Sequence, residues 1–228
     1  MSRSIREQAE TFAVEIMETL AGVIPRGNLG LDLVGDDEQG PFFLTCADPK
    51  GIELQVSEKT VMRLEIEFSL ASDRSGKWLK VRGSKFAVVP EGKGTPFFRY
   101  DFDSEARSVP EAHINIHAHR DDLIAVLVGG GRGTVAKARR RGFVDRGRLP
   151  RVSSVHFPVG GKRFRPCLED VLEAVMQEFG LDGQPGFQKV LDAGRTRYRD
   201  RQLRASVRDQ PDAAIEALQQ LGYRVEPA

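Results

Sequence analysis

The stretch Arg63-Leu64-Glu65-Ile66-Glu67-Phe68-Ser69 alternates apolar and polar side chains without interruption. A β-strand has a side-chain period of two, so this alternation puts Leu, Ile and Phe on one face and the polar groups on the other. The pattern is typical of an antiparallel strand with one buried face and one solvated face. The stretch therefore predicts the centre of an antiparallel sheet that rests on an apolar core.

Similar runs on both sides of this stretch predict the neighbouring strands, because each is bounded by short loops rich in Gly, Pro, Asp or Ser. We expect these strands at 29–34, 41–46, 52–56, 79–82 with a resumption at 86–89, 98–103, 112–119 and 152–157. Residues 121–128 fit either a short helix or a strand. The short loops favour a meander, and we expect an antiparallel sheet of about five to seven strands.

Helical patterns flank the predicted sheet. Residues 4–23 predict an amphipathic helix, because apolar side chains recur at intervals of three and four and because Ser4 and Glu7 have capping-box spacing. Residues 166–179 predict a second helix that covers the sheet, with Pro166 in its first turn and Gly180 just past its end.

The C-terminal residues predict a helical tail. We expect a short helix from 187, an Arg-rich helix near 195–209 and a third helix at 211–221. The fold class is therefore α+β, with a core domain at 1–183 and a small helical tail at 184–228. The length of 228 residues and an apolar content of 40% suit such a domain with an appendage.

The net charge of +1 hides a strong segregation of charge. Residues 132–151 hold eight cations and one anion, a net +7, which leaves −6 for the rest of the chain. The cations are Arg132, Lys137, Arg139, Arg140, Arg141, Arg146, Arg148 and Arg151. A segment of this charge indicates that the protein binds RNA or an acidic protein partner. Because Gly129, Gly130 and Gly131 precede it, we expect a flexible basic loop at 129–150 that binds a partner. The alternative is a solvated basic loop without a binding function.

The two cysteines, Cys46 and Cys167, are far apart and lack metal-type spacing, which predicts a reduced cytoplasmic protein. No apolar run is long enough for a membrane span, and the charged N-terminus does not resemble a secretory signal. Cys167 falls in the first turn of a predicted helix, where the helix dipole lowers a thiol pKa, so a cysteine nucleophile is a minor alternative.

Histidines gather in one predicted strand, His113-Ile114-Asn115-Ile116-His117-Ala118-His119-Arg120. Its period puts the imidazoles and Asn115 on one face and the apolar residues on the other. If this strand pairs with strand 98–103, Asp101 and Asp103 share the polar, solvent-facing side with the imidazoles, and His156 joins them from strand 152–157. Imidazoles beside carboxylates are suited to acid–base chemistry near neutral pH.

Two imidazoles and an arginine are the components of a metal-independent ribonuclease, in which one imidazole takes the 2′-hydroxyl proton, another protonates the leaving oxygen and the cation stabilises the phosphorane. The candidate catalytic residues are His113, His117, His119 and His156, with Asp101 and Asp103 orienting them. The candidate phosphate-binding residues are Arg120, Lys162, Arg163 and Arg165. We expect His117→Ala or His119→Ala to abolish activity without unfolding the chain.

Three alternatives remain open at this point. The polar face is solvent-exposed and has no catalytic function. His117, His119 and His156 hold a catalytic zinc, the only cofactor the sequence suggests, as three imidazoles with an open position do in hydrolases. Or the protein is a non-enzymatic interaction module, whose basic loop binds nucleic acid or an acidic protein partner.

Three segments together carry a resemblance to a known family: Arg99-Tyr100-Asp101, the histidine strand and Pro166-Cys-Leu-Glu-Asp-Val-Leu172. In this order they resemble the TumE-type toxins of bacterial toxin–antitoxin modules. The resemblance covers about residues 77–180; Phe102 stands where that family usually has Asn, and the termini and segment 121–150 are unmatched. It implies a toxin-like or defence-associated protein that acts on RNA or translation and is neutralised by a DNA-binding antitoxin.

Overall fold

The sheet is built around β4 (Lys59–Ser72), whose side chains divide between two faces as the sequence predicts. Leu64, Ile66 and Phe68 are buried, whereas Glu65 and Glu67 lie on the opposite face. The description comes from a computed structural model that describes residues 3–35, 39–92, 94–117 and 134–226. The predicted residues 121–128 lie outside these ranges.

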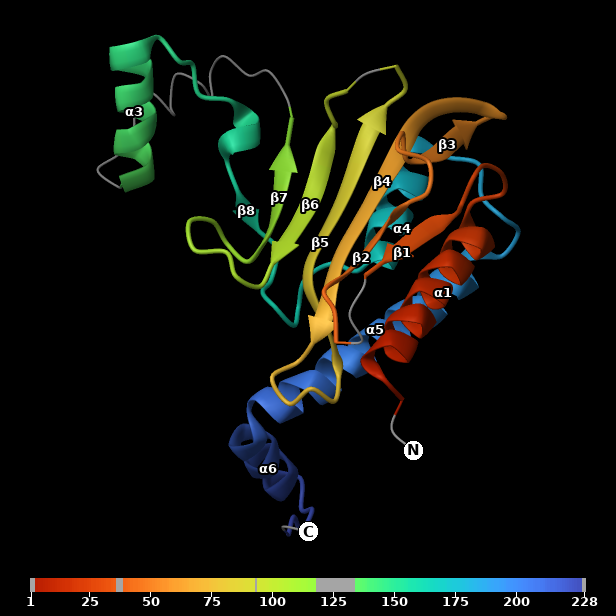
Figure 1. Ribbon diagram of the computed structural model, residues 1–228, viewed down its shortest axis with the longest axis vertical. Helices are drawn as coiled ribbons and strands as arrows, with labels where there is room; N and C mark the ends of the chain where they lie inside the picture. Colours follow the sequence, from red (N-terminus) through yellow and green to blue (C-terminus); the bar gives the residue numbers. More distant parts are fainter. Residues whose placement is uncertain (1–2, 36–38, 93, 118–133, 227–228) are drawn as a thin grey trace.

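Within the described residues the sheet has eight strands, one more than the predicted range, and every pairing is antiparallel. Its order is β1-β2-β4-β5-β6-β7-β8, and β3 pairs with β4 beyond the end of β2 (Figure 1). The strands besides β4 are β1 (Leu31–Val34), β2 (Phe42–Cys46), β3 (Ile52–Val56), β5 (Leu79–Pro90), β6 (Phe98–Asp103), β7 (Ala112–Ile116) and β8 (Phe157–Pro158). The predicted α+β meander is confirmed.

Three helices cover the apolar face of the sheet: α1 (Ile5–Val23), α4 (Leu168–Phe179) and α5 (Phe187–Asp209). The predicted capping box of α1 is present, since the Ser4 hydroxyl accepts from Glu7 N at 3.1 Å and Ser4 N donates to the Glu7 carboxylate at 2.7 Å. Edge-to-face contacts join Phe12 of α1 through Phe68 to Phe86. The N-terminal helix and the covering helix are therefore confirmed.

The predicted tail begins with one helix where we expected two. Helix α5 runs unbroken through Gly194. The glycine allows α5 to lie close to α4, since a Cβ at this position would meet the Glu169 carboxylate. Leu191 of α5 is buried against the core, so the first part of the tail adjoins the sheet-covering layer. Helix α6 (Pro211–Gln220) follows, close to its predicted bounds.

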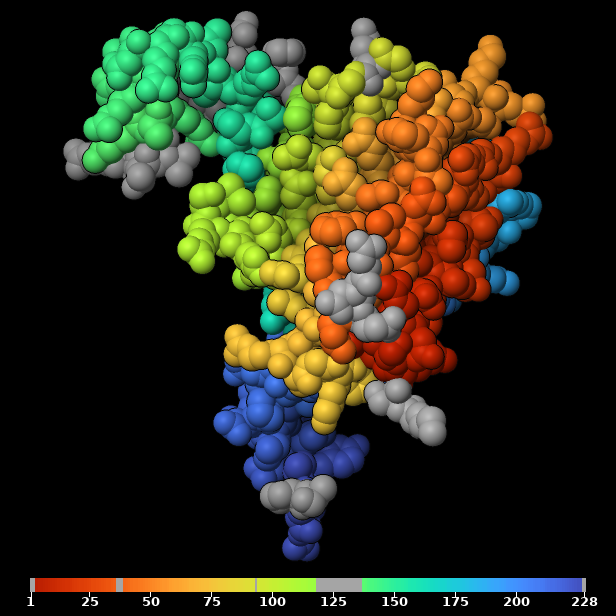
Figure 2. Space-filling view, in the orientation of Figure 1, coloured from red at the N-terminus to blue at the C-terminus, as the bar shows by residue number. Residues whose placement is uncertain are grey.

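The basic segment differs most from its prediction. Residues Thr134–Arg146 form α3 and not an irregular loop, since alanine, lysine and arginine are strong helix formers and outweigh the single Gly142. Residues Val152–Ser154 form the short 3-10 helix η1, held by a bond from Ser154 N to Arg151 O of 3.0 Å, so the predicted strand 152–157 shrinks to β8. Figures 1 and 2 show α3 projecting from the body beyond the β7–β8 edge.

Within the described ranges, no helix combines the length and the apolar character needed to cross a membrane.

Candidate functional site

The pairing of β6 with β7 decides which polar residues meet. Asp101 lies opposite His113, and Arg99 lies opposite Asn115. Tyr100 and Ile114 form the pair between them, on the face that the helices cover. The predicted sharing of one polar face by strand 98–103 and the histidine strand is therefore confirmed for these residues.

Asp101 lies at the centre of a group that we call the histidine cluster: Arg99, Asp101, His113, Asn115, His117 and His156. The Asp101 Oδ2 atom accepts from Arg99 Nε at 2.7 Å and from Asn115 Nδ2 at 2.7 Å. His113 Nε2 lies 3.6 Å from the same oxygen. One carboxylate thus positions an arginine, an amide and an imidazole.

The histidine cluster is more buried than the predicted solvent-facing row. His113 is 5% exposed and Asn115 is fully buried. The cause is the chain around η1, which packs over β7 with Val152 buried against it. From this chain the His156 ring meets the His113 ring edge to face, with centroids 4.5 Å apart. His156 reaches the cluster from the connection between η1 and β8, and not from a strand as predicted.

The two touching imidazoles have different surroundings. Both ring nitrogens of His113 face oxygen atoms, since Nδ1 lies 2.8 Å from the Pro110 carbonyl and Nε2 faces Asp101. A carbonyl only accepts, so Nδ1 of His113 carries a hydrogen and donates it to the Pro110 carbonyl. Burial lowers the pKa of His156, and the nearby positive charges of His113 and Arg139 lower it further. His156 therefore favours the neutral form.

His117 continues the cluster just past the end of β7, where its backbone N donates to Phe97 O at 2.8 Å. Burial lowers the pKa of its imidazole, the charge of Arg99 adds to this effect, and Asp101 opposes it. Three buried atoms of the cluster have no hydrogen-bond partner within the described ranges: Asn115 Oδ1, His117 Nε2 and His156 Nδ1. Buried polar atoms are nearly always paired, so the cluster keeps unused hydrogen-bonding capacity.

The basic helix α3 lies next to the cluster. Arg139 donates from its guanidinium to Ser154 O at 2.6 Å, and its charge contributes to the low pKa of His156. The other described cations of this segment are exposed: Lys137, Arg140, Arg141, Arg146, Arg148 and Arg151. The fold thus brings one cation of the basic segment, Arg139, close to His156.

Other predicted site residues lie elsewhere. The Asp103 carboxylate accepts from Glu105 N at 2.8 Å in the turn after β6, so it shapes that turn and does not reach the imidazoles. Lys162 and Arg163 pair with Asp209 of α5 at 3.3 and 2.7 Å. Arg165 is buried beneath α5. The structure therefore does not bring these three cations to the histidine cluster. His119, Arg120 and Arg132 lie outside the described residues.

The structure leaves the zinc alternative untested and opposes the cysteine alternative. Among the described residues no three His, Cys, Asp or Glu side chains form a group that could hold a metal ion. The predicted zinc ligands include His119, so that alternative stays a prediction. The cysteine alternative required a lowered thiol pKa, and the opposite holds: Cys167 is the buried N-cap of α4, and burial and the neighbouring Glu169 raise the pKa of its thiol far above the usual range.

The sequence placed Asn115 on the polar face, but it assigned no role there to Asn115 or to Arg99. Their part in the cluster follows from the register, which a sequence pattern does not specify to the residue. Comparisons of this chain with protein-family models, with curated proteins and with solved structures found no match.

Proposed function

We propose that this protein acts on RNA and that the histidine cluster is its acid–base site, which cleaves phosphodiester bonds without a metal. The observation that carries the proposal is the contact between two imidazoles in unlike surroundings: His113 lies between the Pro110 carbonyl and Asp101, and burial and positive charge lower the pKa of His156. Different surroundings separate the roles of acid and base between two titratable groups.

In the proposed reaction, neutral His156 removes the proton of a ribose 2′-hydroxyl. The 2′-oxygen forms a bond to phosphorus while the bond from phosphorus to the 5′-oxygen breaks, and that leaving oxygen takes a proton from His113 Nε2, the ring nitrogen that is not bonded to the Pro110 carbonyl. The products are a 2′,3′-cyclic phosphate and a 5′-hydroxyl end. Asp101 positions His113, and Arg99 positions Asp101.

The exposed cations of α3 support RNA as the substrate. They share helix α3 with Arg139, which lies near the partly exposed His156, and cations on an exposed helix bind the phosphate backbone without sequence preference. A toxin-like or defence-associated role in the cytoplasm, with a DNA-binding antitoxin as partner, belongs to this proposal and is supported only by the short motifs of the TumE-type resemblance.

The test is cleavage of a labelled RNA by the purified full-length chain, with His113→Gln, His156→Gln and the control Asp103→Asn. We expect either histidine variant to lose at least about 100-fold in rate, because that is the usual contribution of a general acid or base. Asp103→Asn should cleave like the parent. An RNA with one 2′-deoxy position should resist cleavage there, and a chelator should change nothing. Parent-like cleavage by both histidine variants, with circular dichroism showing both folded, would refute the proposal.

A second function, binding without catalysis, is favoured by the exposure of α3 itself. It predicts that RNA or an acidic protein binds with strong salt dependence and no turnover. The double variant Arg140→Glu with Arg141→Glu should weaken such binding, whereas His156→Gln should leave it unchanged. Metal analysis of the same preparation tests the zinc hydrolase, which requires stoichiometric zinc.

A further inference from the structure

The turn Gly160–Arg165, which the sequence predicted to bind phosphate, does not reach the histidine cluster and forms a closed structure of its own. Gly160 has a φ of +80°, and a Cβ there would meet the Phe164 carbonyl. Phe164 N donates to Gly161 O at 3.1 Å. The backbone of the turn is therefore folded tightly on itself, and its side chains leave it in fixed directions.

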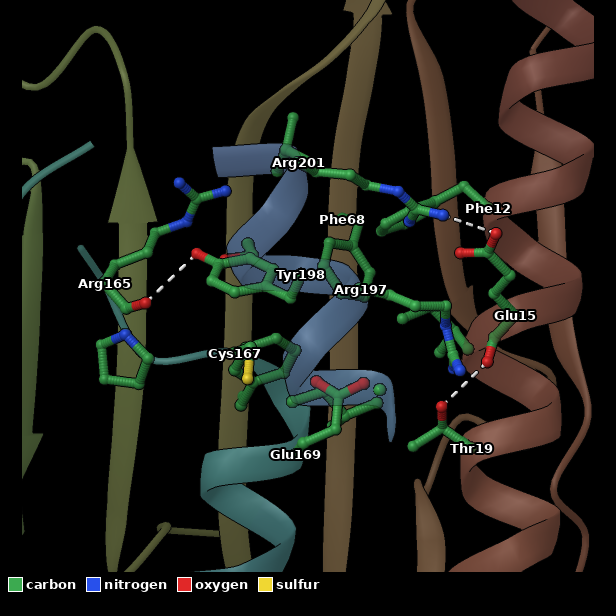
Figure 3. A pocket seen from close by; sticks show the side chains of 17 residues that line it. Phe12, Glu15, Thr19, Phe68, Arg165, Cys167, Glu169, Arg197, Tyr198 and Arg201 are labelled. Carbon is green, nitrogen blue, oxygen red and sulfur yellow. Dashed lines mark hydrogen bonds and ion pairs between the residues drawn. The ribbon is translucent and has the colours of Figure 1, made fainter. Parts of the chain in front are cut away.

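Arg165 anchors this turn inside the fold. It is 7% exposed, and its guanidinium stacks on the Phe102 ring of β6 with a separation of 3.8 Å and donates to Lys162 O. The Tyr198 hydroxyl of α5 donates to Arg165 O at 3.1 Å (Figure 3). Arg165 and Tyr198 also line a pocket between α1, the sheet and α5. No carboxylate among the described residues pairs with Arg165, so the aromatic ring and the carbonyl compensate its charge.

The turn holds two cations beside the end of α5. Lys162 Nζ lies 3.3 Å and Arg163 Nη2 lies 2.7 Å from the same Asp209 oxygen. One carboxylate therefore faces two cations. At this end of α5 the Arg208 guanidinium lies 5.1 Å from the centre of the Trp78 ring, so the hairpin between β4 and β5 adjoins the end of α5 (Figure 1).

Lys80 of β5 adds a cation without a partner. Its ammonium group has no ion pair or hydrogen bond among the described residues. Burial lowers the pKa of Lys80, and the positive charges of Lys162, Arg82 and Arg163 lower it further, while Glu105 opposes them. The four cations share two carboxylates, which leaves a net charge of +2: the cations are Lys80, Arg82, Lys162 and Arg163, and the carboxylates are Glu105 and Asp209.

The ring of Phe164 projects from the turn directly after Arg163. It is 84% exposed, although the turn that carries it is closed and anchored. An aromatic ring that is fixed in solvent beside uncompensated cations is suited to a single nucleic-acid strand, because a base stacks on the ring while the cations hold phosphates. An acidic protein segment would satisfy the cations but would not need the ring.

We propose that the turn Gly160–Arg165 and the start of β5 bind single-stranded RNA, with backbone phosphates at Lys80 and Lys162 and an unpaired base stacked on Phe164. The choice of RNA rests on the proposed function, but binding here requires no reaction at the histidine cluster. The surface does not read sequence, because every base has a flat face and every nucleotide a phosphate.

The test measures binding of a fluorescent 2′-O-methyl oligouridine of about 12 nucleotides to the full-length protein by fluorescence anisotropy. The 2′-O-methyl group removes the nucleophile of the proposed cleavage, so binding is measured without reaction. All proteins carry Arg140→Glu with Arg141→Glu, so that binding at α3 does not hide this surface. We call this double variant the reference protein.

Lys80→Ala should weaken binding at least about threefold and lower the slope of log affinity against log salt by about one, because one phosphate contact is lost. The matched control is Lys59→Ala, which removes an exposed lysine at the opposite end of β4 from Ala71, the residue that pairs with Lys80. This control should bind like the reference protein.

Phe164→Leu should weaken binding at least about fivefold, whereas Phe164→Tyr should stay within about twofold of the reference protein, because only tyrosine keeps a ring for stacking. With a duplex of the same length, in which the base faces are covered, Phe164→Leu should cause no loss. This comparison separates stacking from a general apolar contact.

Three results overturn the proposal. The first is no binding by the reference protein up to about 0.5 mM. The second is unchanged binding by both Lys80→Ala and Phe164→Leu, with circular dichroism showing both folded. The third is displacement of the RNA by polyglutamate at equal charge concentration, which would assign the surface to an acidic protein partner. RNA cleavage by the parent chain is measured separately, so failure here leaves the proposed function standing.

Discussion

Side chains alternate between the two faces of the eight-stranded sheet, and the two faces differ in the kind of side chain that they carry. On the helix-covered face, β4, β5 and β6 contribute Ile66, Phe86 and Tyr100 in one row, packed under α1, α4 and α5. On the opposite face the same strands contribute Glu67, Lys85 and Asp101. The first face excludes water with apolar groups, whereas the second is buried at Ala87 of β5 and at His113 and Asn115 of β7, where polar groups must satisfy one another. Stability therefore resides on one face and the candidate chemistry on the other.

The largest expected effect on stability comes from Ile66 on the helix-covered face, and its neighbour Glu67 on the opposite face is the control. Ile66→Ala removes a side chain that is 1% exposed and should lower the free energy of unfolding by about 2–5 kcal/mol. Glu67→Ala removes only a surface ion pair with Lys85 and should change it by no more than about 1 kcal/mol. Urea unfolding of both variants makes the comparison. Similar losses in the two would contradict the assignment of the core to the helix-covered face.

A smaller effect on stability is expected at Asp101, in the buried part of the polar face. Asp101→Asn replaces a carboxylate oxygen that accepts from Arg99 and Asn115, and should lower the free energy of unfolding by about 1–3 kcal/mol. The matched control Asp103→Asn, two residues along the same strand, keeps a side-chain oxygen for the turn and should stay within about 0.5 kcal/mol of the parent. If both variants unfold like the parent, the histidine cluster is solvated and not buried.

The smallest effect is the pH dependence contributed by His117 and His156. Burial lowers the pKa of both imidazoles below the ordinary value of 6.5, with help from Arg99 for His117 and from His113 and Arg139 for His156. The unfolded chain therefore binds protons first as the pH falls, so this contribution to stability is fully present above pH 6.5 and is lost as the pH falls toward the folded pKa values.

The measurement is the free energy of unfolding of the parent and of the double variant His117→Gln with His156→Gln, from about pH 7.5 to 5.5. The parent should lose more stability than the variant over this interval. Carboxylates titrate mainly at lower pH and are common to both proteins, so they cancel in the difference. A larger loss in the double variant would contradict the lowered pKa values.

Much of the fold was predictable because its signals are local. The alternation around Ile66, the capping box of Ser4 and the apolar stripe of α4 each lie within one element, and all three were confirmed. The basic segment misled us because a net charge says nothing of backbone conformation, while the helix propensity of its alanines, lysines and arginines does.

The candidate site was predictable only in part. The period of the histidine strand put His113 and Asn115 on one face, and a short loop made pairing with 98–103 the simplest topology. The depth of burial was not predictable, because it depends on the chain around η1, about 40 residues further along, packing over β7. The pocket between α1, the sheet and α5 gave no local signal, since its walls come from segments far apart in the sequence.

The sequence by itself determined which residues share a face, because side-chain direction in a strand or helix follows from the backbone period of that element alone. Only the tertiary structure decided that His156 meets His113, that Asp101 holds the cluster together and that Arg165 is buried with no carboxylate partner among the described residues. Contact and burial depend on segments distant in sequence, and the surroundings of an ionisable group, which set its chemistry, are known only once those segments have packed.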